Sequence, residues 1–228
     1  MRNAASLIFA AGLAFLLGVL ALELSLGASP MLVGQGIVNA AADETGAANF
    51  VTSVVLGYRG IDTLGELSIL FATAAGAGLL LGRRRANAAR DPEGGFILRA
   101  GADFLFPLLL VVGFYIVFHG HLTPGGGFQG GVILAAAFFL PILARPSASL
   151  DHGVISLLEG LAGGAFIVIG LWALFTRGDF LAPMLAKGSL GALFSAGTLP
   201  LLYLAVGLKV GAELAGLLAT LSETEAND

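Results

Sequence analysis

The fold of this chain is decided by residues 104–144, which read FLFPLLLVVGFYIVF, HGHLTPGGGFQGG and VILAAAFFLPILA in order. Two apolar runs flank a glycine-rich joint, and neither run alternates between apolar and polar residues as a half-buried strand does. Each run approaches the length of helix that crosses a hydrocarbon core of about 30 Å. Because backbone groups in lipid must be satisfied within their own segment, both runs are predicted to be transmembrane helices.

The rest of the chain repeats this pattern. Of its 228 residues, 57% are hydrophobic and 11% are charged, whereas soluble domains average about 25% charged residues. The mean hydropathy is +0.94, and these values exclude a water-soluble globular enzyme. We predict an all-α, polytopic membrane protein with an interfacial or re-entrant segment after its first span. The six predicted spans are 5–22, 64–81, 104–118, 130–144, 155–175 and 196–219.

Composition also excludes several kinds of chemistry. The chain has no cysteine, which excludes disulfides, thiolate zinc sites, iron–sulfur ligation and a cysteine nucleophile. Its net charge of -4 and pI near 5.3 offer no basic surface to nucleic acid. Neither an HExxH pair nor a nucleophile elbow is present in the sequence. We therefore expect no catalytic activity from this chain alone, and no cofactor or metal.

The distribution of Lys and Arg indicates an orientation, because short cytoplasmic loops carry the positive excess. With both termini in the cytoplasm, seven arginines fall inside and three basic residues fall outside. The rival interpretation treats the first span as a cleaved signal peptide, with Ser25 and Gly27 at the cleavage site. The inside set is Arg2, Arg83, Arg84, Arg85, Arg90, Arg99 and Arg145, and the outside set is Arg59, Arg177 and Lys187.

Small residues four apart indicate where helices approach closely. This spacing favours either packing within the chain or docking against partner helices, and both interpretations stay open. The sets are Gly78 with Gly82, Gly160 with Gly164, and Gly207 with Gly211 and Ala215.

The segment 49–66, NFVTSVVLGYRGIDTLGE, has a mixed character that predicts an amphipathic or re-entrant helix at the outer interface. Asp62 and Glu66 are four residues apart and share a helix face, with Arg59 one turn earlier. One interpretation is an interfacial salt bridge with carboxylates placed at a helix N-terminus. The other is an ion pathway, because Glu66 enters an otherwise apolar span.

The joint between the third and fourth spans, HGHLTPGGGFQGG, is predicted to fold tightly at membrane depth. Its glycines permit positive φ and close approach, and its proline lacks a backbone donor. A phosphate-binding loop is excluded because no GK[ST] follows and no strand precedes. His119 and His121 are two apart and make a poor metal pair, so they are interpreted as capping groups or as a proton relay. The loop residues singled out are Pro124, Gly125, Gly126, Gly127, Phe128, Gly130 and Gly131.

Charges also lie deep in the last span. Lys209 and Glu213 are four residues apart on one helix face, and Glu159 in the fifth span is predicted at a similar depth. A lysine at the helix centre costs about 2.5 to 3.5 kcal/mol in insertion experiments, so these groups are expected to cluster against protein or water. Two interpretations stay open, a static ion pair that fixes helix register and a proton or cation relay.

Two stretches resemble a known family. The glycine-rich joint and its flanking spans, over about 100–219, closely resemble the MnhB subunit of the Mrp (Mnh) family of multisubunit cation/proton antiporters. The stretch YRGIDTLGE, 58–66, is similar to the C-terminal tail of that family's large channel subunit, and to a small subunit of membrane-bound hydrogenases. The resemblance implies a membrane arm that exchanges Na⁺ for H⁺. It also implies functional roles for Asp62, Glu66, the glycine-rich loop and the buried charges.

The sequence departs from the family because only residues 1–49 precede the tail motif, so the helices of the large channel subunit are not in it. The predicted domains are a two-span tail module (1–82), a basic cytoplasmic linker (83–99) and a four-span MnhB-like module (100–228). The resemblance implies a separate antiporter-like channel subunit, other Mrp-type subunits and the lipid bilayer as partners. We expect an accessory subunit of a cation/proton antiporter in a prokaryotic inner membrane. The alternative is the equivalent subunit of a redox-driven ion-pumping complex, such as a membrane-bound hydrogenase.

Overall fold

The computed structural model describes residues 2–23, 32–81, 93–146 and 150–225. These residues form helices and no strand, which confirms the all-α class. The elements are α1 (Arg2–Glu23), α2 (Leu32–Thr45), α3 (Phe50–Thr52), the π-helix η1 (Ser53–Tyr58), α4 (Gly60–Leu81), α5 (Phe96–Phe118), α6 (Gly127–Ala144), α7 (His152–Arg177) and α8 (Leu199–Glu225).

Among the described residues, six helices are long and apolar enough to cross a membrane, as predicted. The largest difference in their bounds is at α5, which begins at Phe96, about two turns before the predicted start. The predicted span began after two charged residues, Arg99 and Asp103, because they interrupt the apolar sequence. In the structure both lie in the first turns of α5, and both are paired. Arg99 donates to Glu93 over 2.8 Å, and Arg145 makes two hydrogen bonds, of 2.8 and 2.7 Å, to Asp103.

The chain divides into two compact units, Met1–Ile37 and Val38–Asp228. In the first unit α1 is a helix whose described side chains are exposed. Residues 24–31 and 82–92 lie outside the described part, and these include the alternative cleavage site and most of the predicted basic linker. The retention of the first span and the predicted domain boundaries therefore stay predictions.

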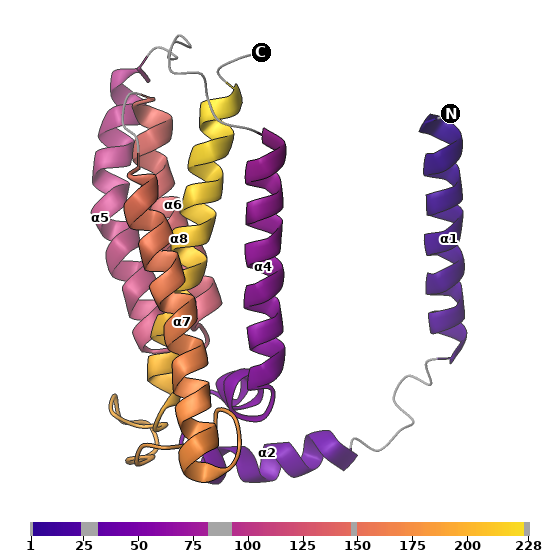
Figure 1. Cartoon of the computed structure of the whole chain (residues 1–228), viewed down its shortest axis with the longest axis vertical. Helices are drawn as coiled ribbons and strands as arrows, with labels where there is room; N and C mark the ends of the chain where they lie inside the picture. Colours follow the sequence, from indigo (N-terminus) through magenta and orange to yellow (C-terminus); the bar gives the residue numbers. More distant parts are fainter. Residues whose placement is uncertain (1, 24–31, 82–92, 147–149, 226–228) are drawn as a thin grey trace. The chain divides into compact units, whose positions relative to one another are not determined.

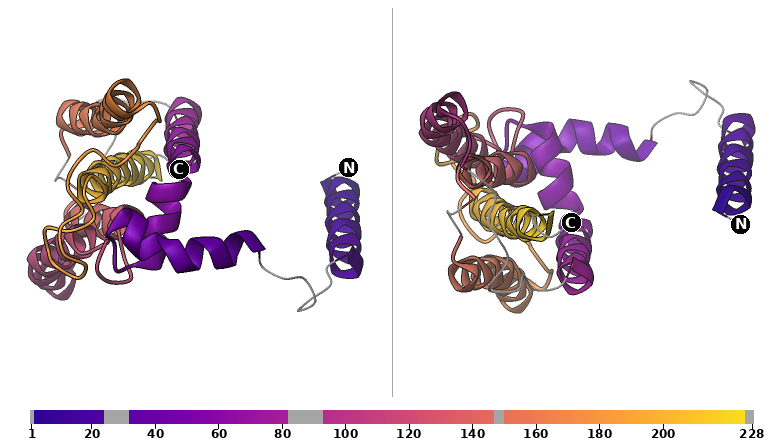
Figure 2. Two further views of the ribbon diagram at one scale, coloured as in Figure 1. Left: turned by 90° about the horizontal axis from the view of Figure 1, so that it is seen from below. Right: turned by 90° about the horizontal axis from the view of Figure 1, so that it is seen from above.

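In the second unit α8 is the central helix. It packs against α4, α6 and α7, while α5 packs mainly on α6 (Figures 1 and 2). The buried share of its membrane window, 61%, exceeds that of each of the other five candidate spans. Helices α4, α6 and α8 run in one direction and α5 and α7 in the other (Figure 1). We call the end where α5 and α7 begin the linker end, and the end where α6 and α8 begin the loop end.

The segment after the first span folds as short helices at the loop end of the bundle. Asn49 caps α3 by accepting from the backbone N–H of Val51 over 3.1 Å, and η1 follows directly. The π-helical turn closes where Arg59 N donates to the carbonyl of Val54 over 2.9 Å, and α4 then begins. Helix α2 was not predicted, because the segment 32–45 mixes polar and small residues without a clear apolar face.

The small-residue sets behave in two ways. A Cβ at Gly207 would lie 2.8 Å from Val117, and one at Gly211 would lie 3.3 Å from the carbonyl oxygen of Gly131. This set therefore packs within the chain, where α8 meets α5 and α6. A Cβ at Gly78, Gly160 or Gly164 would meet nothing within 4 Å, so these positions on α4 and α7 are open.

Candidate functional site

Three charged side chains from two helices meet near the middle of the bundle. The Lys209 ammonium group lies 2.9 Å from Glu159 Oε1 on α7 and 2.8 Å from Glu213 Oε2 on its own helix. The second contact follows from the i, i+4 spacing, which places both groups on one face of α8. The predicted cluster of Glu159, Lys209 and Glu213 is therefore present, and we call it the charged cluster.

The charged cluster is buried to different degrees. The Lys209 side chain is 8% exposed and that of Glu213 is 1% exposed, whereas that of Glu159 is 20% exposed. Phe71 of α4 covers the lysine, with its ring centroid 4.9 Å from Nζ. A cation over an aromatic face is attracted by the ring quadrupole, and this attraction is stronger when water is excluded.

The two carboxylates have different hydrogen-bond states. Lys209 Nζ donates to Glu159 Oε1, but neither buried oxygen of Glu213 has a hydrogen-bond partner among the residues that the structure describes. The contact between Glu213 and Lys209 is thus a close charge contact without hydrogen-bond alignment. An unsatisfied buried charged group is costly, and in native proteins it commonly marks a functional position or an ion.

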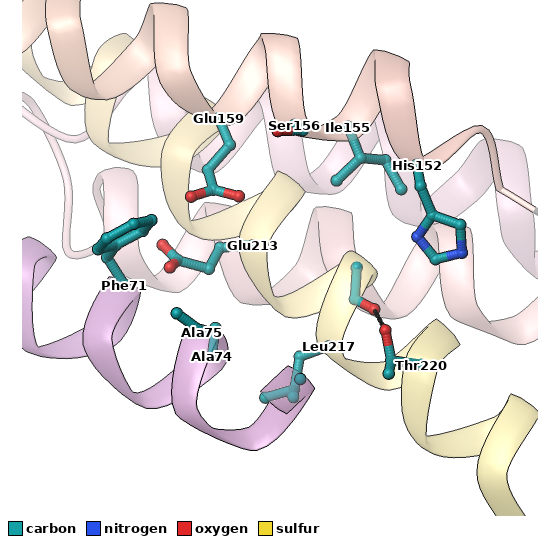
Figure 3. Close-up of a pocket in the computed structure, with 12 residues that line it drawn as sticks. Phe71, Ala74, Ala75, His152, Ile155, Ser156, Glu159, Glu213, Leu217 and Thr220 are labelled. Atoms are coloured by element: carbon teal, nitrogen blue, oxygen red, sulfur yellow. Dashed lines mark hydrogen bonds between the residues drawn. The ribbon is translucent and has the colours of Figure 1, made fainter. Parts of the chain in front are cut away.

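A cavity of about 280 Å³ adjoins the charged cluster. It lies between α4, α7 and α8, and Figure 3 shows the carboxylates of Glu159 and Glu213 near one end and His152 near the other. Because His152 is the first residue of α7, the cavity extends from the charged cluster towards the linker end. The lining residues are Phe71, Ala74, Ala75, Gly78, His152, Ile155, Ser156, Glu159, Glu213, Gly216, Leu217 and Thr220.

The glycine-rich loop closes the loop end by backbone contact. Gly126 has φ +129°, and a Cβ there would overlap the Tyr203 ring. A Cβ at Gly127 would lie 2.6 Å from Val206, and one at Gly131 would lie 2.8 Å from Val210. The predicted tight fold is therefore present, and its glycines let the start of α6 lie directly against α8.

Polar contacts connect this loop to the short helices. Tyr203 donates to Thr52 Oγ1 over 2.6 Å, and Thr52 in turn donates to the carbonyl of Gly120 over 2.5 Å. Asn49 donates to the carbonyls of Gly120 and Thr123, each over 2.8 Å. Sequence reasoning missed this network, because the roles of Tyr203 and Thr52 depend on residues far away in the chain.

The two loop histidines lie in different surroundings. His119 stacks on Tyr115 with centroids 4.1 Å apart, and its Nδ1 is 3.0 Å from the Tyr115 carbonyl. His121 is buried, with Nε2 at 3.1 Å from the carbonyl of Leu193 and Nδ1 without a hydrogen-bond partner among the described residues. Burial lowers the pKa of His121 below its usual value. His119 thus contacts the backbone of its own helix and His121 the backbone of the segment before α8, and the structure does not bring either to the charged cluster.

The candidates on α4 lie closer to the loop end than the charged cluster does. Arg59 and Asp62 form an exposed ion pair of 2.5 Å, which agrees with the i, i+3 spacing. Glu66 is exposed on the next turn and forms no ion pair with another described residue. Since Glu66 precedes Phe71 by five residues, it lies about 7.5 Å along the helix axis from the residue that covers Lys209.

Comparisons with known proteins agree with the sequence resemblance. A family model described as a domain related to the MnhB subunit of Na⁺/H⁺ antiporter matches residues 97–216. An uncharacterized protein of Methanocaldococcus jannaschii is 31% identical over 196 residues, covering 74% of each chain. A putative antiporter subunit mnhB2 of Staphylococcus aureus is 33% identical over 86 residues, covering 35% of this chain and 61% of that one.

Two solved structures extend the likeness to most of the chain. A chain of the archaeal membrane-bound sulfane sulfur reductase, a respiratory membrane complex, superposes with a TM-score of 0.83 at 36% identity, covering 96% of this chain and 97% of that one. A chain of the Mrp complex from Dietzia sp. DQ12-45-1b superposes with a TM-score of 0.77 at 26% identity, covering 100% of this chain and 26% of that one. By sequence and by fold, the chain belongs to the family of membrane proteins related to the MnhB subunit of Na⁺/H⁺ antiporters.

Proposed function

We propose that this chain is an accessory membrane subunit of a multisubunit Na⁺/H⁺ antiporter, where it lines part of an ion route and docks against channel subunits. The observation that carries the proposal is the charged cluster, because ionisable groups in a membrane span are costly and usually serve ion pathways. The proposed location is a prokaryotic plasma membrane, with both termini in the cytoplasm. The chain contributes no catalytic group, and a separate antiporter-like polypeptide supplies the channel.

A line of ionisable groups along α4 and α8 supports an ion route. Asp62 and Glu66 lie towards the loop end, the charged cluster lies at mid-depth, and the cavity continues from it to the linker end. Glu66 is exposed on α4, and a carboxylate on a membrane helix needs protein or water beside it. Its position is therefore consistent with contact between α4 and a partner subunit. The open glycines of α7, Gly160 and Gly164, offer a surface where a partner helix approaches closely.

Transport in everted membrane vesicles tests the α4 carboxylates. If they serve only as interfacial caps, Asp62→Asn and Glu66→Gln each cost about 0.3 to 1 kcal/mol of local stability and leave transport intact. Under the proposed role, the two changes lower Na⁺-dependent proton exchange while the complex still assembles. Glu93→Gln, which changes an exposed carboxylate at the linker end, is the matched control. Normal exchange by both α4 variants would contradict their role.

Replacement of the buried pair by apolar residues separates a static role of the charged cluster from a relay. Buried ion pairs are often replaced by apolar residues of similar volume at little cost in stability. The double variant Lys209→Met with Glu213→Met is therefore expected to assemble under either interpretation. A relay predicts that transport is lost in this variant, whereas a static pair predicts that transport is retained.

The alternative is a component of a redox-driven ion-pumping complex. It is favoured by the likeness to the sulfane sulfur reductase chain, which covers nearly all of both chains at 36% identity. Purification of the complex from native membranes, followed by identification of its subunits, distinguishes the two. Co-purifying subunits with iron–sulfur clusters or other redox centres support the alternative, and a complex of membrane subunits without them supports the antiporter.

A further inference from the structure

Among the residues that the structure describes, the charged cluster is not balanced. With Glu159, Lys209 and Glu213 all ionised, two carboxylates face one ammonium group and one negative charge is left over. The other residues that line the adjoining cavity include no lysine or arginine, and the histidine among them, His152, lies at the end away from the two carboxylates (Figure 3). An uncompensated charge buried in a membrane bundle is strongly unfavourable. The cluster therefore requires one further positive charge.

The position of this missing charge is indicated by Glu213. Its side chain is 99% buried, since only 1% is exposed, and neither carboxylate oxygen has a hydrogen-bond partner among the described residues. The side chains of Glu213 and Glu159 both line the cavity (Figure 3). A cation or a proton between these carboxylates gives Glu213 a further partner beside its ion pair with Lys209 and neutralises the surplus charge in one step.

The cavity has room for the occupant and for water. At about 30 Å³ per water molecule, the volume of about 280 Å³ holds several. Hydroxyl groups of Ser156 and Thr220 and the imidazole of His152 line it between the charged cluster and the linker end. In the opposite direction, buried Leu67 of α4, Phe166 of α7 and Leu202 of α8 pack in the hydrophobic core and fill the space. The linker end is thus the open side.

We propose that Glu159 and Glu213 form an exchangeable site for one monovalent cation, a proton or an alkali metal ion, which arrives from the linker end through this cavity. The site rests on the proposed ion route but does not depend on which complex contains the chain. A single positive charge neutralises the cluster, whereas a divalent ion leaves an excess.

Carbodiimide labelling measures occupancy of the site without measuring transport. Dicyclohexylcarbodiimide modifies protonated carboxyl groups in apolar surroundings, and mass spectrometry of the purified complex locates the product. We expect Glu213 to be modified in choline chloride, where a proton is the available cation. Replacement of choline by sodium at constant ionic strength should slow the reaction by roughly fivefold or more, a usual lower size for coupling between two ligands.

Charge variants test the balance directly. Glu159→Gln leaves one carboxylate and one ammonium group, so Glu213 no longer needs a proton, and both its labelling and the sodium effect are expected to disappear. Glu93→Gln, at an exposed ion pair with Arg99, is the control and should label as the wild type does. Absence of labelling in choline or unchanged labelling in Glu159→Gln would each overturn the site. Equal rates in choline and sodium would overturn the alkali metal ion as occupant and leave the proton.

Cysteine accessibility tests the route. Ser156→Cys lies on the cavity wall about one turn before Glu159, and the chain has no other cysteine. We expect a small, water-soluble cationic thiol reagent to modify it from the side that carries the linker end. Modification only by an apolar maleimide would mean that lipid fills the cavity, and would overturn the route. Neither labelling result bears on the composition of the complex, so the proposed function is tested separately.

Discussion

Removal of the Lys209 ammonium group is expected to be the most destabilising single change in the bundle. In Lys209→Met, two carboxylates remain in the charged cluster without the lysine that contacts both. Glu159 is 20% exposed and regains some contact with water, but Glu213 is 1% exposed and does not. Removal of one partner from a buried pair costs about 3 to 5 kcal/mol, because the other charge is left uncompensated.

A loss of this size is measurable as heat resistance of the purified complex. At about 2 to 4 °C per kcal/mol for a chain of this length, the complex is expected to lose this chain roughly 6 to 20 °C below the wild-type temperature. Size-exclusion chromatography after stepwise heating follows that loss. Lys187→Met is the control, since Lys187 is exposed and donates only to the carbonyl of Asp43 over 3.0 Å. Its expected cost is within about 0.5 kcal/mol.

A second change shows whether uncompensated charge is the cause. Addition of Glu213→Met to Lys209→Met removes the most deeply buried carboxylate, so most of the lost heat resistance should return. If the double variant is no more resistant than Lys209→Met, lost packing around the lysine stem explains the defect instead. If Lys209→Met resists heat as the wild type does, the ammonium group does not stabilise the bundle and the reasoning is refuted.

Three further predictions concern orientation, packing and pH. An impermeant thiol reagent applied to intact cells should modify Thr123→Cys and spare Glu93→Cys, and the reverse pattern would contradict cytoplasmic termini. Gly131→Ala should lower the free energy of unfolding by about 1 to 3 kcal/mol, because its Cβ would lie 2.8 Å from a valine of α8. Gly160→Ala, with nothing within 4 Å, should instead be neutral or stabilise by up to about 1 kcal/mol, and equal effects in thermal unfolding would contradict the packing. Because burial lowers the pKa of His121, the unfolded chain binds more protons, so stability should be full above about pH 6.5 and fall as the pH drops through that value. His121→Gln should flatten this acid dependence in a pH series of unfolding temperatures, and an unchanged dependence would assign it to other groups.

Hydropathy predicted the six spans because the bilayer selects length and apolarity, both of which are local properties of a sequence. The charged cluster was predicted for a related reason. A lysine within an apolar span needs a carboxylate nearby, and the predicted spans contain few carboxylates at its depth. The predicted start of α5 was wrong because the apolar run was taken to begin after Arg99 and Asp103, whereas Glu93 and Arg145 pair with these charges in the structure. Asp103 and Arg145 are 42 residues apart, so the sequence around either residue does not indicate that the two are paired.

The glycine-rich loop was predicted to be tight, but its partner was not predicted. A glycine in the sequence indicates that another part of the chain packs closely against its backbone, but it does not indicate which residue packs there. Tyr203 lies over Gly126 because α8 is the central helix, which is a property of the whole bundle. The same reason explains why the Glu213 cavity was missed. The cavity lies where α4 and α7 both pack on α8 but make little contact with each other, and no residue pattern records such an arrangement.

The central position of α8 also has a consequence for how the bundle forms in the cell. Its packing partners α4, α6 and α7 precede it in the sequence, so the ribosome delivers them to the membrane first. Until α8 is inserted, Glu159 has no lysine beside it, and Gly127 and Gly131 of α6 have no helix to pack against. Multispan chains that expose unfinished surfaces during synthesis are targets for chaperones and proteases. We therefore expect insertion of α8 to commit the bundle to its final packing, and variants that delay it should reduce the amount of protein in the membrane before any effect on ion movement is seen.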